Sequence, residues 1–140
     1  MRLREAGPEE LETVGSLLER YGLPTADLRD GPGTFYLAEV DGSVVGVGGL
    51  EAHEEAGLLR SVAVETTGEG HGTSICAALE ARARDRGLQA LYLLTETAAG
   101  FFESLGYERI ERGDAPPAIR GTEEFAELCG GTAVCLRKRL

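Results

Sequence analysis

The sequence predicts a mixed α/β (α+β) fold with a central sheet of about seven strands, mostly antiparallel with one parallel βαβ crossover, flanked by helices. Two strand-like runs meet at Asp41-Gly42, a strong signal for a tight hairpin turn between antiparallel strands. Later, an apolar strand, a glycine-rich loop, an amphipathic helix and a second apolar strand follow one another as in a parallel crossover. The length of 140 residues, 42% of them apolar, suits one domain over residues 1–140.

The first half of the chain predicts the antiparallel part of this sheet. A helix begins after Gly7-Pro8 because its apolar residues recur on one face. Three glycines inside the second hairpin strand, Gly46, Gly48 and Gly49, indicate a bulge or the close approach of another group; a crowded turn side of the sheet is an equal alternative. The expected elements are a strand (2–6), a helix (9–21), a loop with one short helical turn (22–33) and strands at 34–40, 43–51 and 58–64, with residues 51–57 turning the chain.

The second half predicts the crossover and the strands that complete the sheet. Gly87 and Gly106 each follow a helical pattern and are expected as left-handed helix caps. Pro116-Pro117 breaks the chain, and Thr122 is expected as the N-cap of a short helix. The expected elements are helices at 73–86, 98–105 and 123–128 and strands at 90–95, 107–110 and 133–140.

The formal net charge of −10 makes nucleic acid and anionic membranes poor partners, because the surface repels them. Lys138 is the only lysine beside 13 arginines, and the acidic excess is spread along the chain. This pattern is associated with cytosolic proteins of salt-loving organisms, in which high salt screens the repulsion. An acidic protein from a GC-rich genome has the same pattern, and both interpretations stay open.

The chain is expected to be cytoplasmic, because charged residues follow Met1 without a signal-peptide pattern and no apolar run approaches the ~20 residues of a membrane span. The three cysteines, Cys76, Cys129 and Cys135, lack CxxC spacing, which argues against a disulfide framework and a zinc site. We therefore expect no metal, and a monomer or homodimer.

The segment LLRSVAVETTGEGHGTSICAALE, residues 58–80, carries the main functional signal. Glycines let a ligand approach the backbone closely, and the unpaired N–H groups that open a helix attract phosphate. The segment lacks the Lys-Ser or Lys-Thr pair of a Walker loop, and GxGxG is not the GxGxxG of dinucleotide folds. A diphosphate held by main-chain groups remains, beside the alternative of a plain surface turn.

This segment, the order of elements and the run GFFESLGYERI at residues 100–110 resemble the GNAT superfamily of acyl-CoA-dependent N-acyltransferases over essentially the whole chain. The family motif is Arg or Gln followed by GxGxG; here Thr67 takes the place of the Arg or Gln. The resemblance implies acetyl-CoA as cofactor, with its diphosphate on the loop and its pantetheine arm along the preceding strand. The implied cofactor-binding residues are Val62, Ala63, Val64, Gly68, Glu69, Gly70, His71, Gly72 and Thr73.

Within the superfamily, the sequences LLRSVAV, LYLLTETAAGFFESLGYERI and AIRGTEEFAELC resemble the arsenic-resistance N-acetyltransferases, in particular their second subgroup. This resemblance implies a small-molecule amine as the acceptor, with an amino-acid-like arsenical or toxin as one class. Composition and spacing give no indication of arsenic.

The transfer needs a donor for the developing oxyanion, a base for the amine and a proton for the thiolate. The backbone N–H of Val62 is the candidate oxyanion donor. Phe102 stands where relatives carry a tyrosine acid, so the thiolate, whose unperturbed pKa is near ~8.5, leaves unprotonated or takes a proton from water. Tyr92, Tyr107 or a cysteine as the proton donor is the alternative. Glu51 is the favoured base in a cluster with His53, Glu54 and Glu55; a solvated turn is the alternative.

Arg60 lies in an apolar strand, where a buried guanidinium needs an anion. We expect it to bind the anionic end of the acceptor; pairing with a neighbouring glutamate is a nearly equal alternative. Thr95, at the end of a buried strand, and Cys129, a soft ligand for trivalent arsenic, are the other acceptor candidates.

Two further functions compete with a small-molecule N-acetyltransferase. Thr67 and Phe102 depart from the family at functional positions, as a non-catalytic CoA-binding sensor would. A protein or peptide N-acetyltransferase needs an open groove, whereas residues 116–131 are expected to close the site.

Overall fold

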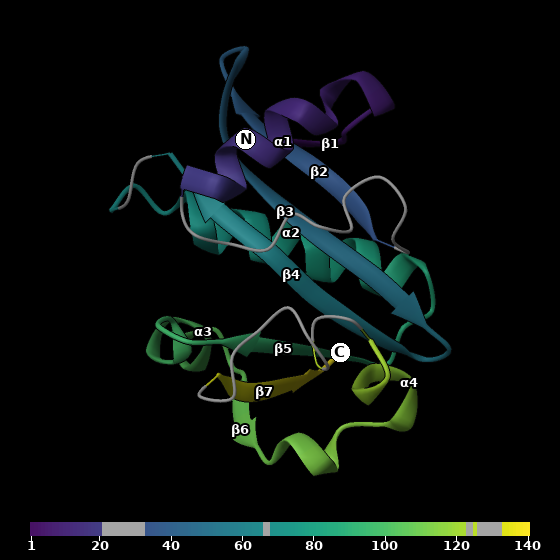
Figure 1. The fold of residues 1–140 in the computed structure, drawn as a ribbon. Coiled ribbons are helices and arrows are strands. Elements are labelled where there is room, and N and C mark those ends of the chain that lie inside the picture. The colour runs from purple at the N-terminus through teal and green to yellow at the C-terminus, as the bar shows by residue number, and fades with distance from the viewer. Residues whose placement is uncertain (21–32, 66–67, 123–124, 126–132) are drawn as a thin grey trace. The chain divides into compact units, whose positions relative to one another are not determined.

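The computed structural model describes residues 1–20, 33–65, 68–122, 125 and 133–140. Seven strands form one sheet in the order β1-β2-β3-β4-β5-β7-β6 (Figure 1). The β4–β5 pair is parallel, and β1–β2, β2–β3, β5–β7 and β6–β7 are antiparallel, which confirms the predicted mixed sheet. The strands are β1 (Arg2–Glu5), β2 (Thr34–Val40), β3 (Ser43–His53), β4 (Ala56–Val64), β5 (Ala90–Thr95), β6 (Glu108–Ile110) and β7 (Val134–Arg139).

The described helices lie between these strands and agree with the predicted order of elements. They are α1 (Leu11–Arg20), α2 (His71–Asp85), α3 (Ala99–Ser104) and α4 (Pro117–Arg120). The chain divides into two compact units. We call Met1–Glu51 with Leu59–Arg82 the N-terminal unit, and Ala52–Leu58 with Ala83–Leu140 the C-terminal unit.

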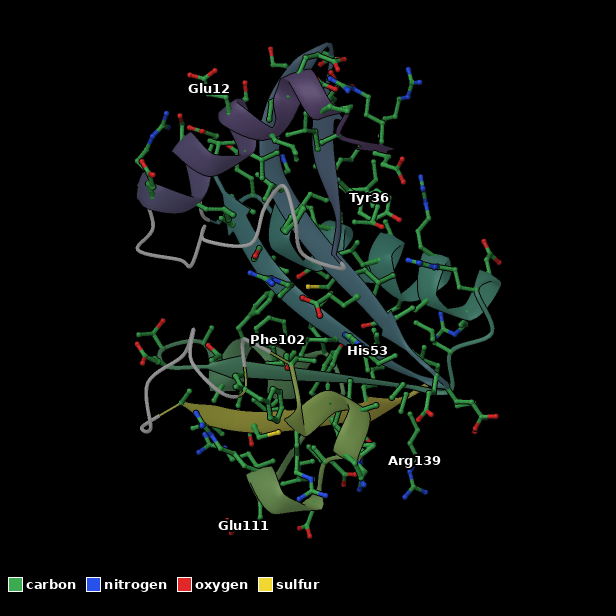
Figure 2. All side chains as sticks on the ribbon, turned by 45° about the vertical axis from the view of Figure 1, so that its right-hand side comes forward. Glu12, Tyr36, His53, Phe102, Glu111 and Arg139 are labelled. Carbon is green, nitrogen blue, oxygen red and sulfur yellow. The ribbon has the colours of Figure 1, made fainter. Side chains whose placement is uncertain are left out.

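In the N-terminal unit, α1 and α2 cover opposite faces of the strands (Figure 1). The apolar face of α1 buries Val14, Leu17 and Leu18, and it packs with Phe35, Leu37, Val47 and Ala63 of the strands. On the polar side of α1, Glu12 points away from the sheet (Figure 2). The face of α2 that carries Ile75 and Leu79 packs on the other side of β3.

The interior glycines of β3 decide how closely α2 and β4 approach this strand. A Cβ atom at Gly48 would lie 2.6 Å from Leu79 Cδ1 of α2. A Cβ atom at Gly46 would lie 2.6 Å from the carbonyl oxygen of Ala63 in β4. Both parts of the first interpretation are therefore borne out: other groups approach Gly46 and Gly48 closely, and the β2–β3 register shifts, as at a bulge, where Ala38 pairs with Gly46 and Glu39 with Val44.

Two tight turns connect the hairpins. Asp41 (φ 51°) and Gly42 (φ 82°) are both left-handed, as the predicted two-residue turn requires. The expectation that residues 51–57 turn the chain is wrong, because β3 extends to His53 and β4 begins at Ala56. The turn consists only of Glu54 and Glu55, and Glu54 adopts φ 61° without the Asn or Gly that usually signals such a turn.

The C-terminal unit has its own apolar core around β5 and β7. Gly87 (φ 79°) and Gly106 (φ 97°) are left-handed residues after α2 and α3, which confirms both predicted caps. Pro117 is the first residue of α4, where its missing N–H costs nothing, so Pro116-Pro117 starts a helix. The buried cluster consists of Ala56, Leu58, Tyr92, Leu94, Ala115, Ile119, Phe125, Ala133 and Cys135.

Differences at the other element ends are small and follow from local hydrogen bonds. The helix expected over 9–21 is a 3-10 turn, Pro8–Glu10, followed by α1. Thr122 Oγ accepts a hydrogen bond from the Phe125 N–H at 3.4 Å, as an N-cap would. The expected loop at 22–33, apart from Gly33, and most of the expected helix at 123–128 lie outside the described residues.

Candidate functional site

The glycine loop ends in an open backbone segment at the beginning of α2. Gly68 (φ 87°) and Gly70 (φ 78°) are left-handed, and a Cβ atom added at either would meet nothing within 4 Å. The first hydrogen bond of the helix runs from the Ser74 N–H to the Gly70 carbonyl at 3.1 Å. The N–H groups of His71, Gly72 and Thr73 precede this bond and have no intrahelical acceptor.

This arrangement fits an anionic ligand such as a diphosphate. The first turn of α2 carries no acidic residue, so the positive end of the helix dipole is not offset within that turn. Gly68 and Gly70 have no side chains, so the space beside their backbone is open. The Glu69 side chain is 62% exposed and lies in solvent.

His71 adds a polar side chain to the same segment. Its Nδ1 atom is buried and, within the described part of the chain, has no hydrogen-bond partner. Its Nε2 atom lies 3.8 Å from a carboxylate oxygen of Glu69, too far for a good hydrogen bond. A buried ring nitrogen without a partner is costly, and an anion in the loop would satisfy it.

The β4 strand is irregular next to the loop. Ser61 lies in the middle of the strand, is buried, and adopts φ 60°. Arg60 lies over the Phe35 ring, and Ala63 belongs to the buried cluster that contains Phe35. In a regular strand, residues three apart point to opposite faces, so the alternation of side chains is interrupted at Ser61.

Sequence reasoning missed Ser61, and nothing in its residue type indicates the conformation. Left-handed backbone at a residue other than glycine costs energy and concentrates at functional sites. Ser61 stands directly before Val62, the candidate oxyanion donor. Val62 and Val64 are half-buried, whereas Ala63 is buried in the core of the N-terminal unit.

The structure brings Glu51 and Arg60 together as a buried ion pair. Arg60 Nη1 donates to Glu51 Oε2 at 2.9 Å, and the two side chains are 0% and 3% exposed. Arg60 Nε also donates to Ser61 Oγ at 3.2 Å. The alternative in which Arg60 pairs with a neighbouring glutamate is therefore the contact observed. The general-base role of Glu51 and the acceptor-binding role of Arg60 both stay predictions.

The remaining candidates lie in the C-terminal unit or outside the described residues. Thr95 Oγ accepts a hydrogen bond from the Ala98 N–H at 3.0 Å, directly before α3. Phe102 is buried edge-on against Tyr107, with ring centroids 5.6 Å apart. Tyr92 lies opposite Arg137 in the register of β5 and β7. Cys129 and Thr67 lie outside the described residues.

Three residues of the predicted base cluster, His53, Glu54 and Glu55, border a pocket of about 480 Å³ within the C-terminal unit. His53 contributes from the end of β3 (Figure 2), and it has an interaction partner in the structure. The lining includes His53, Glu54, Glu55, Gln89, Tyr92 and Pro116.

Burial raises the pKa of the Cys135 thiol to about 11, which disfavours its thiolate. Over the described ranges, no three His, Cys, Asp or Glu side chains group as metal ligands.

None of the helices in the described ranges is long and apolar enough to cross a membrane.

The model of the acetyltransferase (GNAT) domain family matches residues 31–109, more than half of the chain. No curated protein matches the sequence.

Two solved structures are similar to this chain over nearly their whole length. Rv2747 from Mycobacterium tuberculosis, in complex with CoA and the ligand designated NLQ, is 25% identical with a TM-score of 0.80, and the match covers 100% of this chain and 99% of that one. Tetrahymena GCN5 is 11% identical with a TM-score of 0.80, covering 99% of this chain and 96% of that one. The second likeness concerns the fold alone.

N-acetylglutamate synthase from Neisseria gonorrhoeae, complexed with coenzyme A and N-acetyl-glutamate, is 20% identical with a TM-score of 0.81. The match covers 99% of this chain and 35% of that protein, so the likeness concerns one part of the synthase. The CoA in the synthase structure and in the Rv2747 structure agrees with the cofactor predicted for this chain. The predicted acyltransferase class is confirmed, and the arsenic-resistance subgroup stays a prediction. The chain belongs to the GNAT acetyltransferase domain family.

Proposed function

We propose that this chain transfers the acetyl group of acetyl-CoA to a primary amine of a small molecule. The observation that carries the proposal is the open glycine loop: Gly68 and Gly70 are left-handed with free space beside them, at the N-terminus of α2. The N–H groups of residues 68–73 would hold the diphosphate of the cofactor. Acetyl-CoA, when bound, supplies the activated acetyl group.

His71 would donate from Nδ1 to a phosphate oxygen. This role accounts for a buried nitrogen that has no partner in the described part of the chain. A hydrogen bond to a charged group contributes about 1.5–3 kcal/mol, which corresponds to roughly 10- to 150-fold in the dissociation constant. The positive end of the α2 dipole adds to the attraction.

The β4 strand would hold the acyl end of the cofactor. The backbone of Val62, Ala63 and Val64 would pair with the pantetheine arm, and the Val62 N–H would donate to the thioester carbonyl oxygen as negative charge develops there. Phe102 offers no hydroxyl group at the place where relatives carry tyrosine, so the thiolate would leave without a side-chain acid. Glu51 as base and Arg60, Thr95 and Cys129 as acceptor ligands remain predictions.

A binding experiment with matched glycine variants tests the cofactor site. Gly70 (φ 78°) and Gly87 (φ 79°) stand at opposite ends of α2, and both would carry a Cβ atom in open space. Alanine at either position therefore incurs a similar backbone strain of about 1 kcal/mol. We expect Gly70→Ala to weaken acetyl-CoA binding in calorimetry at least tenfold and Gly87→Ala to leave it within twofold. Equal affinities for the two variants would contradict the proposal.

Substitutions of His71 test which ring nitrogen acts. The amide of Asn places a donor near the position of Nδ1, whereas the amide of Gln reaches the position of Nε2. We expect His71→Asn to retain most of the acetyl-CoA affinity and His71→Gln to lose about tenfold or more, as the loss of a charged hydrogen bond predicts. A loss confined to His71→Asn would assign the contact to Nε2 instead.

Turnover distinguishes the competing functions. CoA release is measured by chromatography with L-amino acids, amino-acid-like arsenicals and phosphonates, and a lysine-containing peptide as acceptors, at low and molar salt. Acetylation of a small amine supports the proposal, and tight binding of acetyl-CoA without any product favours a CoA sensor. Peptide acetylation alone favours a protein N-acetyltransferase, which the fold shared with GCN5 permits.

A further inference from the structure

Ser61 differs from the other left-handed residues of the described chain. Asp41 and Glu54, the two others that are not glycine, lie in tight turns, where this conformation closes a hairpin. Ser61 lies inside β4 and is only 7% exposed. Such a conformation persists inside a strand only when the surrounding contacts determine it.

Ser61 is hydrogen-bonded to one member of the buried ion pair. Arg60 Nε donates to Ser61 Oγ at 3.2 Å, and Arg60 Nη1 donates to Glu51 Oε2 at 2.9 Å. The guanidinium carbon lies 5.6 Å from the centre of the Phe35 ring. A Cβ atom at Gly49 would lie 3.2 Å from Arg60 Cγ, so β3 also confines the arginine.

Stability alone does not account for this pair. Removing two charges from water costs about as much as their attraction returns, and apolar residues of similar size are often as stable. The pair instead fixes direction, because the planar guanidinium joins the Glu51 carboxylate on β3 to the Ser61 hydroxyl on β4. The chain from Glu51 to Ser61 thus ends at the residue whose backbone sets the orientation of the next peptide N–H.

We propose that Glu51 and Arg60 are positioning residues: their ion pair holds Ser61 in the left-handed conformation and thereby directs the Val62 N–H at the thioester carbonyl oxygen. The inference rests on the proposed function, because it concerns the donor that this function assigns to Val62. In this inference Glu51 acts through Arg60, and the positioning role takes the place of the general-base role that the sequence predicts for it.

Glycine at position 61 provides the decisive test. Because glycine adopts φ 60° without strain, Ser61→Gly retains the geometry and no longer needs the ion pair. We expect Glu51→Gln to lower kcat about tenfold or more, as the loss of an oxyanion donor does, with the KM for acetyl-CoA within threefold. We expect kcat to become independent of the ion pair in the Ser61→Gly background, so that the double variant stays within threefold of Ser61→Gly.

A second pair of variants covers the case in which Glu51→Gln does not fold. Glu51→Leu with Arg60→Met removes both charges and fills the space with apolar atoms, which buried pairs usually tolerate. We expect this variant to unfold at a urea midpoint close to that of wild type and to lose kcat to the same degree as Glu51→Gln. Adding Ser61→Gly is expected to restore kcat.

Two controls separate positioning from general packing. Glu39→Gln breaks the Arg4–Glu39 ion pair, 2.8 Å long, between β1 and β2 of the same unit, and is expected to leave kcat unchanged. Asp41→Gly places glycine at another left-handed residue and is expected not to rescue Glu51→Gln. Losses of kcat that multiply independently in the Ser61→Gly background would overturn the inference.

The unfolding data decide the inference even if the wild-type protein transfers no acetyl group. If the pair holds Ser61, the shift in urea midpoint caused by Ser61→Gly must differ between the wild-type and the Glu51→Leu/Arg60→Met backgrounds. Equal shifts in the two backgrounds would overturn the inference. Absence of CoA release and of acetyl-CoA binding in the wild-type protein overturns the proposed function and the role of the Val62 N–H, whereas the hold of the ion pair on Ser61 is decided by the unfolding data.

Discussion

Substitution of Gly46 by alanine is expected to destabilise the protein more than any other exchange of a β3 glycine for alanine. The new Cβ atom would lie 2.6 Å from the Ala63 carbonyl oxygen and 2.7 Å from Ile75 Cδ1. To reach even a tight contact of 3.4 Å, the new Cβ atom and the Ala63 carbonyl oxygen must move apart by about 0.8 Å. The carbonyl is part of the backbone of a neighbouring strand, so it cannot rotate away. Overpacking of this kind costs about 3 kcal/mol, the upper part of the usual range.

Gly48→Ala provides the matched comparison, because its nearest neighbour is the end of a side chain. The Cβ atom would lie 2.6 Å from Leu79 Cδ1 and 3.1 Å from Ile75 Cγ2, and side chains can change rotamer. We expect a cost of about 1–2 kcal/mol. Gly100→Ala in α3 meets nothing within 4 Å and is expected to stabilise by about 0.5 kcal/mol, because alanine favours the helix.

Thermal and urea unfolding measure this series. For a chain of this length, 1 kcal/mol corresponds to roughly 3–5 °C in the melting temperature. Gly46→Ala is therefore expected to melt about 10–15 °C below wild type, Gly48→Ala about 3–10 °C below it, and Gly100→Ala slightly above it. A loss for Gly46→Ala no larger than that for Gly48→Ala would refute the close approach of β3 and β4 at Ala63.

Three further predictions concern stability and reactivity. Hydrogen bonds from Arg4 lower the pKa of Glu10 from 4.5 to about 2, so this contribution to stability is complete above pH 4.5 and is lost as the pH falls towards 2; Glu10→Gln should flatten acid unfolding in that window. Because burial raises the pKa of Cys135 to about 11, its thiol should stay unmodified by iodoacetamide at pH 8 in the folded protein, as mass spectrometry would show. Thr122→Ala removes a hydrogen bond to the Ile119 carbonyl (2.7 Å) and should cost about 1–2 kcal/mol in urea unfolding, whereas Thr122→Ser should retain it.

Each of these has a result that contradicts it. An unchanged acid midpoint in Glu10→Gln would show that the carboxylate does not titrate abnormally. Rapid alkylation of Cys135 in folded protein, compared with a urea-unfolded control, would contradict its burial. Equal stability of the serine and alanine variants of Thr122 would mean that its hydroxyl group contributes nothing.

The sequence alone determined the elements and the features that depend on neighbouring residues. The Asp41-Gly42 turn, the caps at Gly87 and Gly106 and the glycine loop before α2 were predictable, because residue type limits the backbone over a few positions. The order of these elements was enough to predict the mixed sheet, and together with the glycine loop and the run GFFESLGYERI it predicted the family.

Only the tertiary structure decided which distant residues meet. The sequence predicts two different roles for Glu51 and Arg60, and the fold joins these two residues in one buried ion pair. The left-handed backbone of Ser61 and of Glu54 is not signalled by residue type, because neither is the Gly, Asn or Asp that usually marks such a conformation. Local propensity describes what a residue permits, whereas long-range packing selects among the permitted conformations, and in this chain that selection shapes the strand before the glycine loop.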